Sequence, residues 1–414
     1  MDSTPRRIFF SVGATALLVA SATFGCQATR GGMNETLGPE PVAQAAISQV
    51  RIELLERAFA VASAIPVAPH IKDRSRCQEA VVVTCLELDR PDLAARYVDR
   101  IENWRRGSAY ADLASHCAGR GMVADAERYL ALAATVADSA EDWRKDRVKE
   151  KIARSSALLA VAKAKAADDS AREADSKTPA IASSAKAVLD RAEIERRLSE
   201  VGPIAEKGNF DQIRVALYAC AALYDEVYAD EANRKLVDQT IESSWGKVPV
   251  TVRIDVLSML AGSALRHQDQ MTARSILTRA EALMNGADWL PEDRIPVVAR
   301  LALMRHRAGE TDLAKSAAEG ALALFRAERE RMINIDRADA LRPLAEAVFE
   351  ISGATAAMEI YRLAVEEGVA NPNSRPRAED LALTCASMAR VGLEPDEQLS
   401  IRITAIAGGL SDPW

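Results

Sequence analysis

One alanine pattern recurs four times along this chain and constrains its fold more than any other feature. In each copy a Leu-Ala pair is followed by a second alanine twelve residues after the first and by a third alanine seven residues later. Two antiparallel helices joined by a short turn need small residues where their axes cross, so this spacing predicts helical hairpins that stack on their neighbours. We therefore expect an all-α fold, an α-solenoid. The four copies are Leu113-Ala114 with Ala126 and Ala133, Leu260-Ala261 with Ala273 and Ala280, Leu301-Ala302 with Ala314 and Ala321, and Leu344-Ala345 with Ala357 and Ala364.

Large side chains at fixed distances from these alanines complete the pattern. Tyr110 and Leu130 accompany the first copy, Leu257 and Leu277 the second, and Leu341 and Tyr361 the fourth. In this arrangement the units resemble the tetratricopeptide repeat, which implies a stack of hairpins with a concave inner face. The family's closing proline is absent, and the later units recur every 41 to 43 residues instead of 34, so the curvature of the stack does not follow from the resemblance.

The first residues are typical of an export signal. Arg6-Arg7 precede an apolar run from residue 8 to 24, and Gly25-Cys26 closes it. We expect residues 1–25 to be a signal peptide. The end of the run resembles a bacterial lipobox, which implies lipidation of Cys26 and a location in the cell envelope or periplasm as a membrane-anchored lipoprotein. An uncleaved anchor and ordinary secretion remain alternatives, and the paired arginines also resemble a twin-arginine signal.

Composition divides the rest of the chain. Residues 26–42 are rich in glycine, proline and polar side chains, which predicts a flexible tether. We expect a first helical-repeat block at 43–170, a charged, alanine-rich insert or connecting helix at 171–208, and a second helical-repeat block at 209–414. The last hairpin, around residues 381–406, matches the register poorly and is interpreted as a capping unit.

The number of cysteines and the net charge indicate which cellular compartment and which class of partner to expect. If Cys26 carries lipid, five cysteines remain, an odd number, and the simplest interpretation is that they are small buried residues. A bridge between Cys85 and Cys117 is an alternative because the two occupy equivalent places in adjacent hairpins. A formal net charge of −7 argues against a nucleic-acid partner.

Signatures of catalysis and of metal binding are missing from the sequence. The four histidines include no pair three to five residues apart, and we find no CxxC, no glycine-rich phosphate loop and no GxSxG. We therefore expect no cofactor, no metal and no enzymatic activity.

The resemblance also implies where a partner binds. In the tetratricopeptide family, first-helix side chains that point away from the Leu-Ala pair line the concave groove. The four arginines among the matching positions are expected to form a ladder that grips a carboxylate or an acidic peptide. The alternative is a solvated face with local salt bridges. The matching positions are Asp112, Arg266, Arg300, Arg307, Arg342, Glu346 and Phe349.

The leading functional hypothesis is a non-enzymatic scaffold that binds a protein or peptide in the cell envelope. One alternative is a helical enzyme whose active site is assembled across hairpins. Another is a structural envelope protein that associates with itself.

Overall fold

The computed structural model describes residues 48–174, 191–199, 201–245 and 248–414. All regular structure in these ranges is helical, so the predicted all-α class is confirmed. The predicted signal peptide, the tether and Cys26 lie outside the described residues. The helices of the first half are α1 (Gln49–Ala64), α2 (Val67–Glu87), α3 (Pro91–Val98), α4 (Arg105–Gly119), α5 (Val123–Ser139), α6 (Asp142–Ala174), α7 (Arg191–Ser199) and α8 (Val201–Lys207). Those of the second half are α9 (Phe210–Glu226), α10 (Glu231–Ser243), α11 (Val250–Arg266), α12 (Gln270–Asn285), α13 (Pro291–Arg307), α14 (Thr311–Glu328), the short 3-10 turn η2 (Arg329–Arg331), α15 (Asn334–Ser352), α16 (Ala354–Val369), α17 (Ser374–Val391) and α18 (Glu397–Gly408).

The alanine pattern marks the helix crossings as predicted. Its four copies form the hairpins α4/α5, α11/α12, α13/α14 and α15/α16. All twelve alanines are buried, with at most 3% of their surface exposed. A methyl side chain at each crossing lets the two helix axes approach closely, and the hairpin is held by the contacts this allows.

A left-handed residue closes several of the hairpins. Gly121 and Gly309 have φ values of +73° and +81°, and each lies seven residues after the alanine of its Leu-Ala pair. Asp89 and Gln268 take up the same conformation at the matching places in two other hairpins, with φ values of 57° and 60°. Positive φ reverses the chain in a few residues, and glycine adopts it without steric cost.

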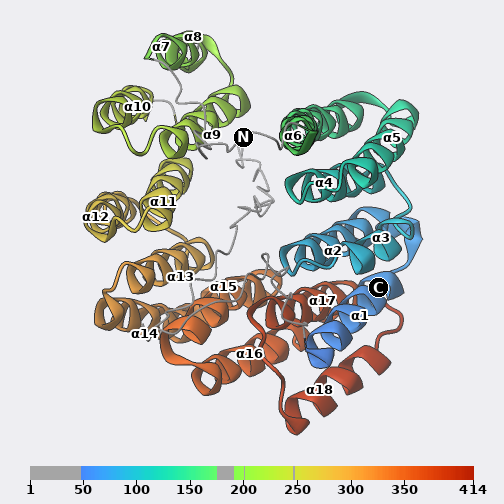
Figure 1. Cartoon of the computed structure of the whole chain (residues 1–414). Helices are drawn as coiled ribbons and strands as arrows, with labels where there is room; N and C mark the ends of the chain where they lie inside the picture. Colours follow the sequence, from blue (N-terminus) through green and yellow to red (C-terminus); the bar gives the residue numbers. More distant parts are fainter. Residues whose placement is uncertain (1–47, 175–190, 200, 246–247) are drawn as a thin grey trace, which may run out of the picture.

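At one place the spatial order of the stacked helices differs from their order in the sequence. Helix α1, the first described helix, packs along α17, the last helix but one, as the second helix of a hairpin packs along the first. Helix α2 also packs on α17 and occupies the next position in the stack. In space the solenoid therefore runs from α7 to α17 and continues through α1 to α6, so that α6 and α7 lie at the two ends of an arc (Figure 1).

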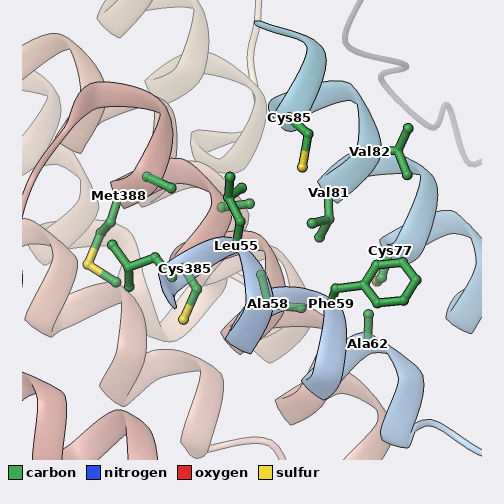
Figure 2. Close-up of a cluster of buried hydrophobic side chains, with 14 of the residues drawn as sticks. Leu55, Ala58, Phe59, Ala62, Cys77, Val81, Val82, Cys85, Cys385 and Met388 are labelled. Atoms are coloured by element: carbon green, nitrogen blue, oxygen red, sulfur yellow. The ribbon is translucent and has the colours of Figure 1, made fainter. Parts of the chain in front are cut away.

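Buried side chains from three helices fill this junction. Leu55, Ala58 and Phe59 of α1 contact the same core as Val81 of α2 and Met388 of α17 (Figure 2). Each of these five is at most 1% exposed. One apolar core therefore includes residues from both ends of the chain, and the predicted boundary near residue 170 does not separate it.

Polar contacts reinforce the same junction. Arg51 of α1 donates to the carbonyl oxygens of Ala389 and Arg390 at 2.7 and 2.8 Å. Those carbonyls belong to the last turn of α17, where helices leave carbonyl groups without a full set of internal donors. The Ala389 carbonyl also accepts a hydrogen bond from the Gly392 N–H at 3.3 Å. Arg51 of α1 thus supplies additional donors to the C-terminal end of α17.

One prediction about the ends of the stack is wrong. The last hairpin does not cap the solenoid, because α17 lies in its interior between α15 and α2, and α18 packs outside it against α16. The region predicted as an insert or connecting helix contributes to the stack through α7, within its described part. Ile194 and Leu198 of α7 are buried in the second apolar core together with residues from α9 to α13.

Candidate functional site

The first helices of the hairpins form the inner layer of the arc (Figure 1). In spatial order these helices are α9, α11, α13, α15, α17, α2, α4 and α6, and we call them the inner layer. The second helices and α1 lie on the outside. The residues predicted to line a groove all belong to the inner layer: Asp112 on α4, Arg266 on α11, Arg300 and Arg307 on α13, and Arg342, Glu346 and Phe349 on α15.

The arginines of the predicted ladder are bound to carboxylates on neighbouring helices. Arg266 contacts Asp225 of α9 at 3.0 Å. Arg307 makes a two-pronged contact with Glu350 of α15, at 2.6 and 3.1 Å. These guanidinium groups hold adjacent hairpins together, as the salt-bridge alternative expects.

Arg300 also contacts a carboxylate on a neighbouring inner-layer helix, but one of its nitrogen atoms takes no part in such contacts. Its guanidinium lies 2.7 Å from a carboxylate oxygen of Asp255 on α11. Its Nε atom is buried and makes no hydrogen bond within the described part of the chain. Arg300 therefore combines a firm contact between hairpins with a donor that is not used.

Arg342 is buried, which contradicts its predicted exposure in a groove. Only 8% of the residue is exposed, because α17 packs directly over α15 at this point. Its guanidinium contacts Asp339 and lies 3.3 Å from Asp380 of α17. Burial raises the pKa of the Asp380 carboxyl to about 6, although the nearby arginine opposes that shift. Phe349 is also partly buried against the main core.

Glu346 contacts Arg390, a residue that was not among the positions predicted from the sequence. It accepts hydrogen bonds from Ser387 at 2.6 Å and from Arg390 at 2.7 Å, both on α17. Arg390 also donates to Glu87 at 2.7 Å and to Thr84 at 3.1 Å, both on α2. One guanidinium therefore bridges three inner-layer helices, across the place where the chain order is interrupted. Burial alone would lower the pKa of Arg390, but the carboxylates of Glu346 and Glu87 together raise it.

The same kind of contact continues to the α6 end of the arc. Lys151 of α6 reaches Asp112 of α4 at 2.6 Å and Glu79 of α2 at 3.5 Å. Arg105 of α4 also contacts Glu79. Burial would raise the pKa of Glu79, but the two cations and Ser108 hold it below its usual value. Burial raises the pKa of Asp112, with Lys151 opposing the shift.

Together these contacts form a continuous ion-pair belt across the inner layer. Every step from α9 to α6 carries at least one pair between neighbouring inner-layer helices. The belt contains both signs of charge, and each of its cations is paired with a carboxylate. An acidic peptide would have to displace carboxylates that already occupy the arginines, and that exchange yields little net free energy. The pairs that make up the belt are Asp225–Arg266, Asp255–Arg300, Arg307–Glu350, Arg342–Asp380, Glu346–Arg390, Arg390–Glu87, Arg76–Glu379, Glu79–Arg105 and Asp112–Lys151.

Further features of the described residues concern metal binding, disulfide bonds and membrane spanning. These residues hold no group of three or more histidine, cysteine, aspartate or glutamate side chains arranged to bind a metal ion. Cys85 and Cys117 are both buried and free, which rules out the alternative of a bridge between them in this structure. Burial raises the pKa of the Cys85 thiol to about 12. No helix in the described ranges is long and apolar enough to span a bilayer.

Comparisons with known proteins find matches among solved structures. No protein-family model matches the chain. No curated protein matches it either. A solved structure described as a circular tandem repeat protein with novel repeat topology and enhanced subunit contact surfaces is 14% identical in sequence. The match covers 88% of this chain and 96% of that one, with a TM-score of 0.19. The assignment of the fold therefore rests on the helices described above.

Proposed function

We propose that the protein is an exported, membrane-tethered and non-enzymatic scaffold, and that its tetratricopeptide-like inner layer binds a protein or peptide partner in the cell envelope. The observation that carries this proposal is the inner layer itself. It joins helices from both ends of the chain into one surface, which runs from α9 to α6 and is held by the ion-pair belt. Stacked repeats use extended surfaces of this kind for recognition.

The belt refines the expected chemistry of the partner. Because carboxylates accompany the arginines at each step, a partner that carries only acidic groups has no free cation ladder to bind. A partner with both signs of charge can align opposite each pair without breaking it, and complementary patterns of this kind give specificity. This replaces the acidic peptide as the favoured ligand.

Charge reversal of whole pairs tests the role of the inner layer. The double variant Arg300→Asp/Asp255→Arg keeps an ion pair between α13 and α11 but inverts the pattern that a partner meets. A matched control is Arg402→Glu/Glu366→Arg, which exchanges an exposed pair between α18 and α16 on the outside. We expect affinity capture from native envelopes with mass spectrometry to lose the enriched partner with the inner-layer variant and to retain it with the control. Equal capture by both variants contradicts the proposal.

Membrane attachment is tested separately. The sequence at Gly25-Cys26 supports a lipid anchor, and Cys26→Ser is expected to move the protein from the membrane fraction to the soluble fraction. Retention of this variant in the membrane fraction points instead to an uncleaved apolar anchor.

A further inference from the structure

Helix α6 lies at one end of the arc, and only one of its sides is covered (Figure 1). The covered side, with the buried residues Val148, Ser155 and Leu159, packs on α4 and α5. Each inner-layer helix from α11 round to α4 has an inner-layer neighbour on both sides. The stacking that continues through the arc therefore stops at an uncovered side of α6, which we call the open face.

The open face is apolar along the middle of the helix. Val161 is 69% exposed and Leu158 is 37% exposed. Four exposed alanines follow one another at intervals of four, three and four residues, which places them on one side of the helix. They are Ala153, Ala157, Ala160 and Ala164. Elsewhere in this stack the alanines of the repeat are buried where helices cross, so the open face has the composition of a surface that packs on another helix.

The opposite end of the stack does not complement the open face. The exposed side of α7 is charged, and its charges already pair with one another. Arg191 lies 2.6 Å from Glu195, and Arg196 lies 2.8 Å from Glu193. A head-to-tail contact would bury these charges against alanine side chains, which costs free energy.

The charges at the two ends of the open face complement each other. Glu150 precedes the apolar stretch and Lys165 follows it, and both are exposed without an ion pair in the part of the chain that the structure describes. If two copies of α6 pack antiparallel about a twofold axis between Ala157 and Leu158, Glu150 of each copy lies opposite Lys165 of the other. Arg154, which is also exposed, can lay its apolar stem on the contact and keep its guanidinium in water.

We propose that the open face of α6 is a dimer interface, on which α6 of a second copy of this chain packs antiparallel. The contact is centred on Ala157 and bordered by two Glu150–Lys165 pairs, and it is closed because each copy covers the open face of the other. Helix α6 has 33 residues, against 15 in α4 and 17 in α5, and is about 50 Å long. One helix pair rich in alanine is still a small interface, so we expect a dissociation constant on the order of 10 µM.

Sedimentation velocity of the full-length protein at about 1–100 µM tests the interface without any other partner. We expect a monomer–dimer equilibrium with no larger species. Ala157→Glu places a charge at the centre of the contact and should weaken dimerisation at least tenfold. The matched control is Ala282→Glu at an exposed position on α12, and it should dimerise as the unaltered protein does. Circular dichroism checks that each variant is folded.

Charge reversal tests the antiparallel pairing. Glu150→Lys and Lys165→Glu each place like charges opposite each other twice in the dimer, so each variant alone should dimerise at least threefold more weakly. A mixture of the two variants restores opposite charges at both positions and should form a mixed dimer at least as tightly as the unaltered protein dimerises.

Three results would overturn the proposal. The first is an unaltered protein that stays monomeric up to about 100 µM, including one that instead binds vesicles of anionic phospholipid through the open face. The second is equal dimerisation of Ala157→Glu and Ala282→Glu. The third is a mixture of the charge variants that associates no more tightly than either variant alone. Because the purified protein is tested alone, these results are distinct from a failure to capture an envelope partner.

Discussion

The ion pair between Arg390 and Glu87 offers a direct energetic test of the junction between the two ends of the chain. These residues are 303 positions apart in sequence, and their N and O atoms are 2.7 Å apart. A double-mutant cycle with Arg390→Ala, Glu87→Ala and the combined variant isolates the free energy of this contact from the other effects of each substitution.

The expected coupling free energy follows from how exposed the two side chains are. The Arg390 side chain is 34% exposed and that of Glu87 is 28% exposed. Fully exposed pairs contribute about 0.2–1 kcal/mol, and hydrogen bonds to charged groups that are well buried contribute about 1.5–3 kcal/mol. For this half-buried pair we expect a coupling free energy of about 1 kcal/mol. Arg390→Ala alone should cost about 2–3 kcal/mol, because it also loses the contacts to Glu346 and Thr84.

The assay is equilibrium unfolding in urea, followed by circular dichroism at 222 nm, for the four members of the cycle. A control cycle on Arg307 and Glu350 measures an ion pair between hairpins that are neighbours in the sequence. Coupling near zero for Arg390 and Glu87, together with measurable coupling in the control, would refute the placement of α2 against α17.

Three further predictions concern crossings, pH and buried hydroxyls. Ala314 is fully buried at a crossing, so Ala314→Leu should lower the unfolding free energy in urea by about 1–3 kcal/mol, whereas Leu at the exposed Ala282 should change it by less than about 0.5 kcal/mol; equal effects would count against the crossing. The raised pKa of Asp380, about 6 against 3.8, means that the stability it contributes is fully present below pH 3.8 and is lost as pH rises through 6. Between pH 4 and 7.5 the unfolding free energy of the unaltered protein should therefore fall. In Asp380→Asn the fall should be smaller by on the order of 3 kcal/mol. Identical pH profiles of the two proteins would contradict this prediction. The Tyr97 hydroxyl is buried without a hydrogen bond in the described residues, whereas that of Tyr361 bonds Ser387 at 2.8 Å. Thermal and urea unfolding should show Tyr97→Phe as neutral or stabilising by about 1 kcal/mol and Tyr361→Phe as destabilising by a similar amount, and the reverse order would be inconsistent with this structure.

The hairpins could be predicted from the sequence because their determinants are local. An alanine at position 126 and a Leu-Ala pair at 113–114 meet in space because a short turn brings one helix back along the other. That geometry depends only on helix rise and on turn length. The spacing of small residues therefore carries the information directly.

The junction could not be derived from the same information. Spacing along the chain says which helices pair within a hairpin, but α1 and α17 are separated by almost the whole chain. One local signal was present: residues 381–389 read LALTCASMA, without a charged side chain. A helix that is apolar on all sides is buried on all sides, so this segment is an interior element and a poor candidate for a cap.

The pairing of the inner-layer charges also had a signal in the sequence. The partners of Lys151, Arg307 and Arg390 lie 39, 43 and 44 residues away, about one hairpin in each case. Opposite charges that recur at the period of a stacked repeat indicate contacts between neighbours. The exposure of Arg342 could not be judged in this way, because its burial depends on how closely α17 packs over α15.

Cutting the chain between its two blocks tests the central claim most directly. A specific protease site placed between residues 182 and 183 allows the purified, folded protein to be cleaved, and size-exclusion chromatography with light scattering then reports the mass in solution. We predict that the two fragments stay together as a one-to-one complex with the mass of the intact protein, because α1 and α2 remain packed on α17. Separation into two species, each with the mass of one fragment, would contradict the proposed arrangement.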